Sequence, residues 1–563
     1  MSFFQDPPSL GDLFEGDIVL RAFLANHVPA DVLREIEPSL REMAALARGP
    51  LYNLLREDEA AQPVLTSWDP WGRRVDRIEL TRLWKETLRI SAEKGLVAIP
   101  YERRHGAFSR LHQFALVHLF EPSSGVTSCP LAMTDGAAKT LSVSGNAELA
   151  ARALPRLTTR DPARAWTSGQ WMTERIGGSD VAATETVARL EGGAWRLHGT
   201  KWFTSATTAE MALTLARPEG NPPGGKGLAL FYLETRDEAG NPNGLLIHRL
   251  KDKLGTRMLP TAELELVGAR AIPVKGLSDG VKNITTMLNM TRTWNAVAAV
   301  SGMRRALDLA RDYAGKRVAF GTPLSEKPLH AETLADLEAL YAGAFLLTFR
   351  VVELLGREEN GALLEGEDSL LRLLTPIAKL TTGKQAILVA SEALEAFGGA
   401  GYIEDTGLPR LLRDAQVLPL WEGTTNVLAL DLLRALTKVG GLASIEREIS
   451  RRLAGAGAGG PLGAAARSAS EAVRHAAAWF SRVSDTTELE AGARRFALTL
   501  GHALEATLLI AEASRMPDGH PLRHAAARFA RFPLDSIRDD APLEEARALL
   551  GAAEPLPAGR EKP

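Results

Sequence analysis

Glu422 is the residue whose type and neighbours point most directly to chemistry. It lies in residues 421–426 (WEGTTN), where a carboxylate is followed by a glycine and two hydroxyl side chains. A positioned carboxylate can act as a general base that accepts a proton from a substrate. A run of this kind also serves simply as a loop before a helix, so the motif alone leaves both interpretations open.

Two polar motifs lie in the strand-like part of the chain. Residues 170–180 (QWMTERIGGSD) and 199–204 (GTKWFT) combine hydroxyls, flexible glycines and an aromatic pair. A flavin needs peptide and hydroxyl donors along its pyrimidine edge and pyrophosphate, with flat apolar cover over its rings, and this mixture supplies both. Either motif alone is more often a polar turn beside a core tryptophan.

Two further motifs lie at the ends of expected helices. Residues 317–321 (RVAFG) close one helical segment, and residues 397–402 (FGGAGY) end another. Singly, each is an ordinary helix end, because paired glycines usually form a C-cap and a lone arginine is usually solvated. Their joint occurrence with residues 421–426 is harder to dismiss and indicates a shared site.

The elements that would position these motifs follow from periodicity. Residues 17–157 favour helix, and residues from 283 onward return to helix, with the segments 331–357 and 370–396 long enough for a bundle. Between them, residues 262–266 alternate strictly, which predicts an antiparallel sheet with one buried face. Strand-like runs are expected at residues 184–190, 195–203, 211–216, 228–234, 245–250 and 262–267.

A fourth unit follows a break in composition. Residues 454–461 (AGAGAGGP) are typical of a flexible linker, and the sequence after them is again helical. The predicted domains are an α-helical domain (residues 1–165), a β domain (166–280), a helical-bundle domain (281–440) and an additional α-helical domain (441–563).

Composition limits the class of protein. The 563 residues are 45% hydrophobic and 24% charged with a net charge of -3, which are globular values that predict no general attraction to polyanions. The single Cys129 excludes an intramolecular disulfide and a cysteine-based metal cluster. The start lacks a signal-like pattern, and we see no uncharged apolar run of about 18 residues, so we expect a cytoplasmic protein without a membrane span.

Two short motifs are misleading. Residues 455–460 look like a dinucleotide loop, but no βαβ unit encloses them. Residues 276–280 fit the GxSxG pattern of serine hydrolases, but they join a sheet to a helix and favour a turn. None of the 11 histidines forms an HExxH pair, so the sequence gives no support for metal catalysis.

In sequence order, the motifs above resemble those of the acyl-CoA dehydrogenases, roughly over residues 166–436. Residues 249–257 (RLKDKLGTR), residues 129–134 (CPLAMT) and the appended C-terminal unit look most like the AidB branch, which is associated with the response to DNA alkylation. The resemblance implies a mainly α fold with a central antiparallel β domain: an α domain, a β-barrel or sandwich, and a four-helix bundle, plus an extra C-terminal helical domain.

The same resemblance implies FAD in the cleft between the sheet and the helical domains of a homotetramer. Thr173 and Ser179 would offer hydroxyls to the flavin, and Trp202 would pack on its rings. Arg317 and Phe320 would meet the pyrophosphate and adenine portion across the subunit boundary. The full set of implied cofactor-binding residues is Met172, Thr173, Gly178, Ser179, Trp202, Phe203, Thr204, Arg317, Phe320, Gly398, Gly399, Gly401, Thr424 and Asn426.

By resemblance, Glu422 removes the α-proton of an acyl-CoA thioester while a hydride leaves the β-carbon for flavin N5. Partial desolvation between flavin and substrate would make the carboxylate a stronger base, and hydrogen bonds to the thioester oxygen would stabilise the enolate-like charge. Some family members carry the base at the position of Thr291, and a threonine cannot do that work. The implied substrate-binding residues are Ser179, Asn289, Arg292 and Gly423.

One departure from the family pattern concerns the substrate. Family members often have an aspartate three residues before the helix arginine that contacts acyl-CoA, whereas this chain has Asn289 before Arg292. An amide still forms hydrogen bonds, but the lost charge predicts a departure from ordinary recognition of a CoA ester. Trp294 either narrows the pocket or fills the core.

We therefore expect an FAD-dependent acyl-CoA dehydrogenase of fatty acid metabolism, with an electron-transferring flavoprotein as acceptor. The alternatives are an AidB-like flavoprotein that binds DNA with little turnover, and a non-catalytic carrier of acyl-CoA or lipid. Residues 441–563 hold 15 Arg and one Lys against 16 Asp and Glu, without the positive excess that nucleic acid binding needs. Residues 494–531 are locally basic, so a single basic face stays open.

Overall fold

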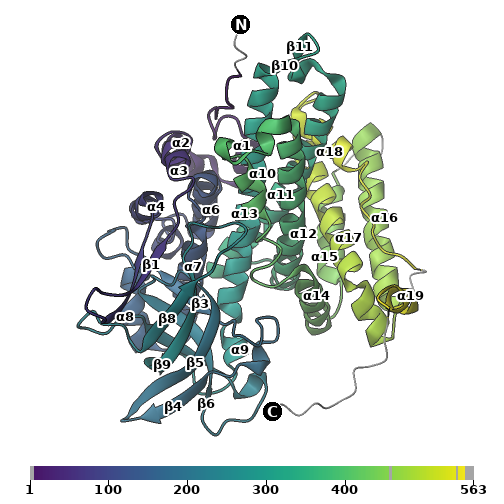
Figure 1. Ribbon diagram of the computed structural model, residues 1–563. Coiled ribbons are helices and arrows are strands. Elements are labelled where there is room, and N and C mark those ends of the chain that lie inside the picture. Colours follow the sequence, from purple (N-terminus) through teal and green to yellow (C-terminus); the bar gives the residue numbers. More distant parts are fainter. Residues whose placement is uncertain (1–4, 456–459, 540–542, 552–563) are drawn as a thin grey trace. The chain divides into compact units, whose positions relative to one another are not determined.

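The computed structural model in Figure 1 describes residues 5–455, 460–539 and 543–551. Its contacts divide the chain into two compact units, Met1–Thr424 and Thr425–Pro563. Residues 456–459, within the predicted linker, lie outside the described residues. The four predicted domains, with boundaries at residues 165, 280 and 440, stay a prediction.

The first unit begins with helices that start at side-chain caps. Asp17, Thr81 and Asn146 each accept a hydrogen bond from a backbone N–H in the first turn of the helix that follows, which satisfies a donor that the helix itself leaves unpaired. The helices are α1 (Ile18–His27), α2 (Ala30–Arg48), α3 (Pro50–Glu57), α4 (Arg82–Glu93), α5 (Ile99–Glu102), α6 (Ser109–Phe120), α7 (Ser128–Val143) and α8 (Ala147–Leu157).

A β-hairpin interrupts this helical region, which the sequence did not predict. Strands β1 (Val64–Trp68) and β2 (Arg74–Glu79) pair antiparallel around a turn at Gly72, whose φ of +79° suits glycine. The carboxylate of Asp69 accepts hydrogen bonds from the backbone N–H groups of Trp71 and Arg73. This local capping favours the turn over a continuous helix.

Seven strands form the central sheet. They are β3 (Ser168–Trp171), β4 (Val187–Glu191), β5 (Ala194–Ser205), β6 (Met211–Pro218), β7 (Ala229–Glu234), β8 (Leu245–Leu250) and β9 (Thr261–Pro273). The order is β3-β6-β4-β5-β9-β7 with β8 on β9, and β6 also pairs with β7, so the pairings close on themselves as in a barrel.

Most strand pairs are antiparallel, as predicted, but β6 pairs in parallel with β3 and β4. Parallel pairing needs a long connection between the two strands, and the segments that join β3 and β4 to β6 are far longer than a two-residue hairpin turn. Inside the ring, Trp171, Leu197, Phe231, Leu264 and Leu266 form a dry core, which the alternation along β9 predicted.

Three long helices complete the first unit, together with short α9 (Gly280–Asn283) and α13 (Pro409–Ala415). They are α10 (Thr285–Lys316), α11 (Pro328–Glu359) and α12 (Glu367–Ala396), which pack against one another, and α10 also packs on α7. In Figure 1 they stand beside the strands of the sheet. Helix α10 contacts the loop that carries Glu422 through Arg292 and Asn295.

The second unit is all-helical in its described residues. Its elements are α14 (Thr425–Val439), α15 (Ala443–Leu453), α16 (Gly460–Arg482), α17 (Thr486–Ala513), α18 (Pro521–Phe529) and α19 (Leu543–Leu549). Helix α17 contacts α14, α15, α16 and α18 and is the centre of the unit. At Gly492 it passes so close to Trp479 that a Cβ would lie 2.2 Å from the indole ring.

Helices α11 and α17 are long and apolar enough to cross a membrane by composition alone. The most apolar 18-residue windows are 94% and 83% buried within the structure, respectively. Burial of this extent is typical of core helices, whose apolar surface packs against other parts of the protein.

Candidate active site

The loop that carries Glu422 has an unusual backbone. Glu422 has a φ of +58°, in the left-handed region, and Gly423 follows with a φ of +103°. For a residue with a Cβ this conformation costs roughly 1 to 2 kcal/mol, and it persists only where the surroundings enforce it. The side chains packed on this loop must therefore hold it in place.

Two buried basic side chains bond to the backbone of the loop. Arg292 Nε donates to the carbonyl oxygen of Glu422 at 3.2 Å, and Lys379 Nζ donates to that of Gly423 at 2.6 Å. Both residues are buried. Burial lowers the pKa of Lys379 to about 7, against an opposing effect of the nearby Glu422 carboxylate. Two successive carbonyl groups are thus held by α10 and α12.

A third contact comes from Asn295, also on α10. Its side-chain Oδ1 accepts a hydrogen bond from the indole N–H of Trp421, and its Nδ2 donates to the backbone carbonyl oxygen of Leu418 at 3.2 Å. One buried amide therefore ties the segment before Glu422 to the same helix that holds the carbonyl of Glu422 itself.

The carboxylate of Glu422 faces a small cavity. Its Oε2 accepts a hydrogen bond from Thr291 Oγ1 at 2.6 Å and a longer one from Gln170 Nε2 at 3.4 Å. Thr291, the second position at which the resemblance implies a base, therefore lies directly beside Glu422. The cavity is lined by Ser128, Cys129, Ala132, Met133, Thr291, Trp294, Asn295, Ala298, Trp421 and Glu422.

The two sheet motifs, residues 170–180 and 199–204, lie next to each other, as their sequences predicted. The backbone N–H of Trp202 donates to the carbonyl oxygen of Thr173 at 3.0 Å. Beneath them, buried Lys201 Nζ lies 2.7 Å from Glu174 Oε1, which also accepts from the hydroxyl of Thr186. Burial would raise the pKa of Glu174, but these partners outweigh it and hold that pKa below its usual value.

Above the ion pair of Lys201 and Glu174, polar groups without partners in the described residues are available to bond to a ligand. The hydroxyls of Thr173 and Ser179 have no hydrogen-bond partner within the described part of the chain, and the loop around them is exposed. Nearby on β3, Gln170 Oε1 is buried without a partner, as is Asn289 Oδ1 on α10. Two free hydroxyls and two unpaired acceptors beside an aromatic side chain fit a polar, flat-ringed ligand such as a flavin.

Trp202 is already in contact with a cation. Lys251 Nζ lies 4.2 Å from the centroid of its ring, and the guanidinium of Arg175 lies 5.5 Å away. A ring that stacked on Trp202 would share it with these cations. The next two predicted residues differ: Phe203 is 47% exposed, whereas Thr204 is buried and its hydroxyl donates to the carbonyl oxygen of Ala262 at 2.7 Å.

The two helix-end motifs lie on exposed segments. Phe320 is 98% exposed at the tip of the hairpin formed by β10 (Val318–Ala319) and β11 (Thr322–Pro323). A Cβ at Gly398 or Gly399 would meet nothing within 4 Å, so these positions are open for a ligand or a second copy. Gly401 differs, because a Cβ there would lie 2.0 Å from the carbonyl oxygen of Leu394. Local packing alone explains that glycine.

The remaining residues predicted to bind the cofactor lie partly in the first unit and partly in the second. Met172 packs on the core next to the sheet, Gly178 accommodates the Thr173 side chain, and Thr424 ends the first unit. Asn426 belongs to the second unit, where its side-chain Oδ1 accepts a hydrogen bond from Arg494 Nη1 at 3.5 Å. Arg317 bonds to Gln5 Oε1 at 3.3 Å.

Three residues of the site were not predicted: Gln170 as a partner of Glu422, Asn295 and Lys379. The sequence does mark Lys379, because it is a single basic residue in the apolar run 376–380 (PIAKL) of a long helix. A buried cation in such a run needs a specific partner. Gln170 and Asn295 have no comparable signal.

Other chemical groupings do not form sites. Ser301, His118 and Asp17 are linked by hydrogen bonds of 3.1 and 3.0 Å like a catalytic triad, but all three are buried and no substrate can reach them. Ser278 of the GxSxG motif lies in an exposed turn before α9, as predicted. Within the described residues, no group of three or more His, Cys, Asp or Glu is placed to hold a metal ion.

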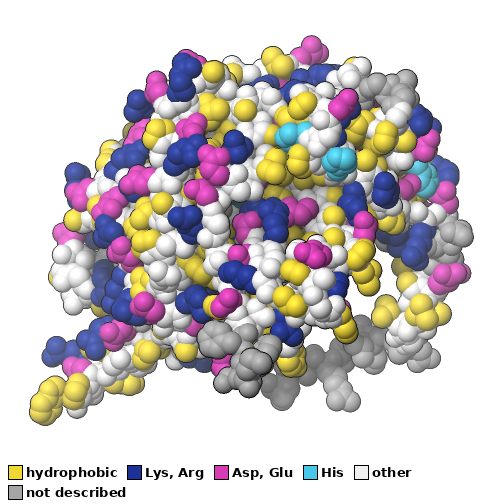
Figure 2. All heavy atoms as spheres, turned by 90° about the horizontal axis from the view of Figure 1, so that it is seen from above, with side chains coloured by type: hydrophobic (Ala, Val, Ile, Leu, Met, Phe, Trp, Pro, Cys, Tyr) yellow, Lys and Arg dark blue, Asp and Glu magenta, His cyan; other side chains and the backbone are white. Residues whose placement is uncertain are grey.

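Positive charge is dispersed. Figure 2 shows Lys and Arg interspersed with Asp and Glu on the face in view. In the second unit, Arg482 pairs with Asp539 and Arg523 with Asp518. Pairing of this kind reduces the positive field that would attract nucleic acid.

Comparisons with known proteins agree with this architecture. Residues 6–162 match the adaptive response protein AidB N-terminal domain, residues 169–268 the acyl-CoA dehydrogenase middle domain, and residues 278–437 the acyl-CoA dehydrogenase C-terminal domain. The chain is 48% identical over 445 residues to acyl-CoA dehydrogenase family member 11 of Caenorhabditis elegans, covering 77% of this chain and 72% of that protein. It is 33% identical over 425 residues to the putative acyl-CoA dehydrogenase AidB of Escherichia coli, covering 73% and 75%.

A solved structure extends the likeness over nearly the whole chain. The structure of Caenorhabditis elegans ACDH-11 in complex with C11-CoA superposes with a TM-score of 0.95 and 41% identity, covering 98% of this chain and 96% of that one. Butyryl-CoA dehydrogenase from Megasphaera elsdenii shares the fold, with a TM-score of 0.60 and 21% identity over 71% of this chain and 98% of that one. The predicted fold class and resemblance are confirmed: the chain is an enzyme of the acyl-CoA dehydrogenase family, with an AidB-type N-terminal domain.

Proposed function

We propose that this enzyme is an FAD-dependent acyl-CoA dehydrogenase that removes the α-proton of an acyl-CoA thioester with Glu422. The observation that carries the proposal is the strained loop at Glu422, which Arg292, Asn295 and Lys379 hold with the carboxylate at a cavity. The complex of C11-CoA with a relative that superposes over nearly the whole chain supports an acyl-CoA substrate.

The residues that would hold FAD are the open polar groups of the sheet motifs. The free hydroxyls of Thr173 and Ser179 would donate to it, and Trp202 would lie against its rings. When bound, FAD supplies the acceptor for the hydride that leaves the β-carbon. The exposed Phe320 and the open Gly398 would meet the cofactor of a neighbouring subunit.

The protein's own residues account for the proton transfer. Glu422 Oε2 accepts the α-proton, and the hydroxyl of Thr291, 2.6 Å away, keeps this oxygen directed into the cavity beforehand. A positioned general base of this kind is worth about 10²- to 10⁴-fold in rate. The backbone N–H of Glu422 has no partner in the described part of the chain and would donate to the thioester oxygen, where charge develops. Loss of the proton and a hydride leaves a 2-enoyl-CoA.

The assembly and the acceptor follow as parts of the same proposal. Phe320 and Tyr402, 98% and 90% exposed, favour coverage by further copies in a homotetramer. An electron-transferring flavoprotein would reoxidise the enzyme. We place it in the cytoplasm, in fatty acid metabolism.

Anaerobic titration with acyl-CoAs tests the proposal. The holoenzyme should lose its flavin absorbance on addition of saturated acyl-CoAs, and mass spectrometry should detect the 2-enoyl-CoA product. A holoenzyme that keeps its full absorbance with every chain length would refute dehydrogenation. Binding of those acyl-CoAs without bleaching would instead favour a carrier.

A further inference from the structure

The connection between β8 and β9 contains none of the residues that the resemblance implies for cofactor or substrate. It includes residues 251–257 (KDKLGTR), which we call the β8–β9 segment. Its first residue, Lys251, contacts the ring of Trp202, and its later residues pack on α13. The segment therefore connects the indole that would lie against FAD with a helix that follows it by about 150 residues in the sequence.

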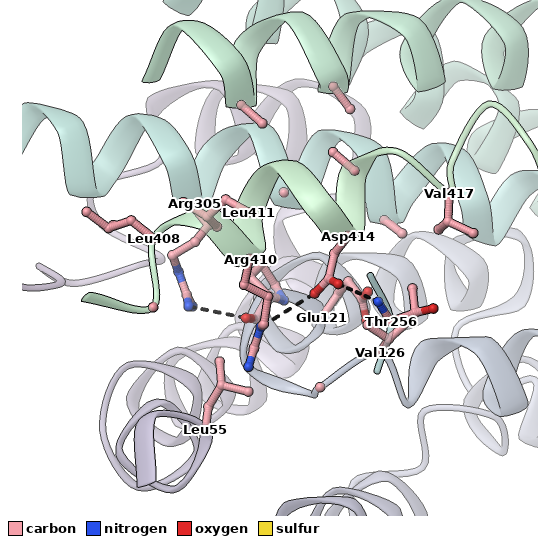
Figure 3. Close-up of a pocket in the computed structure, with 18 of the residues that line it drawn as sticks. Leu55, Glu121, Val126, Thr256, Arg305, Leu408, Arg410, Leu411, Asp414 and Val417 are labelled. Atoms are coloured by element: carbon pink, nitrogen blue, oxygen red, sulfur yellow. Dashed lines mark hydrogen bonds and ion pairs between the residues drawn. The ribbon is translucent and has the colours of Figure 1, made fainter. Parts of the chain in front are cut away.

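The far end of the β8–β9 segment is fixed to α13. The backbone N–H of Thr256 donates to Asp414 Oδ1 at 2.6 Å, which Figure 3 shows as a dashed line at the edge of a cavity that both residues line. A Cβ at Gly255 would lie 2.3 Å from the carbonyl oxygen of Arg413, so this position requires glycine. Thr256 has a φ of +51°, in the left-handed region that a residue with a Cβ disfavours. The packing on α13 therefore enforces the path of the segment.

The near end of the segment is fixed to the start of β9 and the residues just before it. Lys253 Nζ donates to the carbonyl oxygen of Leu259 at 2.8 Å and to Thr261 Oγ1 at 3.0 Å. The backbone N–H of Lys251 donates to the carbonyl oxygen of Thr261 at 2.8 Å. With α13 at one end and β9 at the other, the backbone of Lys251 has a fixed position.

This backbone places the Lys251 side chain between a carboxylate and an indole ring. Its Nζ lies 2.7 Å from Glu263 Oε1 and 4.2 Å from the centroid of the Trp202 ring, and the side chain is only 11% exposed. A lysine side chain loses much rotamer freedom when it is held in this way, and tryptophan is the ring that attracts a cation most strongly. The ammonium group therefore has a defined place at the indole.

Glu263 does not cancel the positive charge at the indole. Its Oε1 also lies 2.8 Å from Arg249 Nη2, so one carboxylate faces two cations. The guanidinium of Arg175 lies 5.5 Å from the centroid of Trp202 and adds a further positive charge. Together these side chains leave net positive charge beside Trp202.

We infer that the β8–β9 segment holds the Lys251 ammonium group at Trp202 and that this charge raises the reduction potential of the bound flavin. The inference rests on the proposed function, in which Trp202 lies against the flavin rings. Two-electron reduction near neutral pH adds negative charge to the ring system, and a fixed positive charge nearby favours the reduced form. A higher potential makes the flavin a stronger acceptor for the electrons of the acyl-CoA.

The test is the reduction potential of the flavin in the holoenzyme, measured by anaerobic titration with a chemical reductant and a reference dye. For Lys251→Gln we expect the ratio of reduced to oxidised flavin at a fixed potential to fall about tenfold, or about 30 mV for a two-electron couple. Lys251→Arg keeps the charge and should stay within about threefold of wild type. Arg257→Gln is the matched control and should keep the wild-type ratio. It removes the same charge from the same segment, but this guanidinium bonds to the carbonyl oxygen of Lys253.

Thermal unfolding of the apoprotein gives a second readout that needs no flavin. Lys251→Gln and Trp202→Leu should each lower the Tm, and the double variant should lower it by less than the sum of the two losses. The reason is that both changes remove the same contact between the cation and the indole. Additive losses would show that the contact is absent in solution and would overturn the inference.

A wild-type potential in Lys251→Gln, or an equal shift in Lys251→Gln and Arg257→Gln, would also overturn it. Chemical reduction needs no acyl-CoA, so the potentials decide the inference even if no acyl-CoA bleaches the flavin and the proposed function fails. A protein that takes up no flavin at all would overturn both.

Discussion

Two loops of the first unit are built in opposite ways. The loop at Glu422 is held at successive residues by Asn295, Arg292 and Lys379, and its carboxylate is bonded to Thr291. The loop at residues 173–180 is pinned from below through Glu174, but the hydroxyls of half-buried Thr173 and exposed Ser179 are unpaired in the described structure.

Under the proposed function, the difference separates two tasks. A base must be in place before the substrate arrives, so the protein itself supplies every contact and accepts the strain at Glu422. A cofactor loop instead keeps its donors free, because the ligand is to be their partner. We therefore expect changes in the first loop to affect rate, and changes in the second to affect cofactor affinity.

The largest effect is expected for Glu422→Gln. The amide keeps the shape but cannot accept the α-proton, so the rate of flavin reduction should fall about 10³-fold or more, with FAD affinity unchanged. Stopped-flow absorbance under anaerobic conditions measures the rate. Glu395→Gln, an exposed carboxylate on α12, is the matched control and should keep the wild-type rate. A Glu422→Gln enzyme that reduced flavin as fast as this control would remove Glu422 from the mechanism.

The second largest effect is expected for Lys379→Met. It leaves the carbonyl of Gly423 without its donor, and an unsatisfied buried acceptor costs about 1 to 3 kcal/mol, so we expect kcat to fall about tenfold or more while KM changes little. FAD affinity should not change. A defect in FAD affinity with a normal kcat would reverse the assignment of tasks to the two loops.

Thr173→Ala should have a smaller effect, on the other loop. The loss of one hydrogen bond of about 1 kcal/mol should weaken FAD binding about fivefold, measured by flavin fluorescence on dilution. Because the hydroxyl has no partner in the described protein, the Tm of the apoenzyme should stay the same. In the control Thr184→Ala, the lost hydroxyl bonds to Val181, so stability should fall and FAD affinity should not.

The smallest expected effect is on how the Tm depends on pH. Burial lowers the pKa of Lys379 from 10.5 to about 7, so between these values the unfolded chain binds a proton that the folded chain does not. The contribution of Lys379 to stability therefore rises with pH across this window, and the penalty is complete below pH 7. The Tm of Lys379→Met minus that of wild type should be larger at about pH 6 than at about pH 9.5. A difference independent of pH would contradict the burial of a titrating lysine.

The spacing of apolar residues is a local property of the sequence, and for this reason it predicted the order of helical and strand regions. It missed the β1–β2 hairpin, whose turn depends on Asp69, and the parallel pairs of β6, because a strand's sequence does not specify its neighbour. It also missed most of what holds Glu422. Gln170 is 252 residues away from Glu422 in sequence and Thr291 is 131 away, so only tertiary packing brings them together.

The most direct test of the central claim is hydrogen exchange at the α-carbon. An acyl-CoA with sulfur in place of the β-carbon cannot lose a hydride, so in deuterated water only proton removal and return are observed by mass spectrometry. We predict that wild-type holoenzyme incorporates deuterium at the α-carbon and that Glu422→Gln does not. Equal incorporation by both enzymes would show that another group takes the proton and would contradict this account.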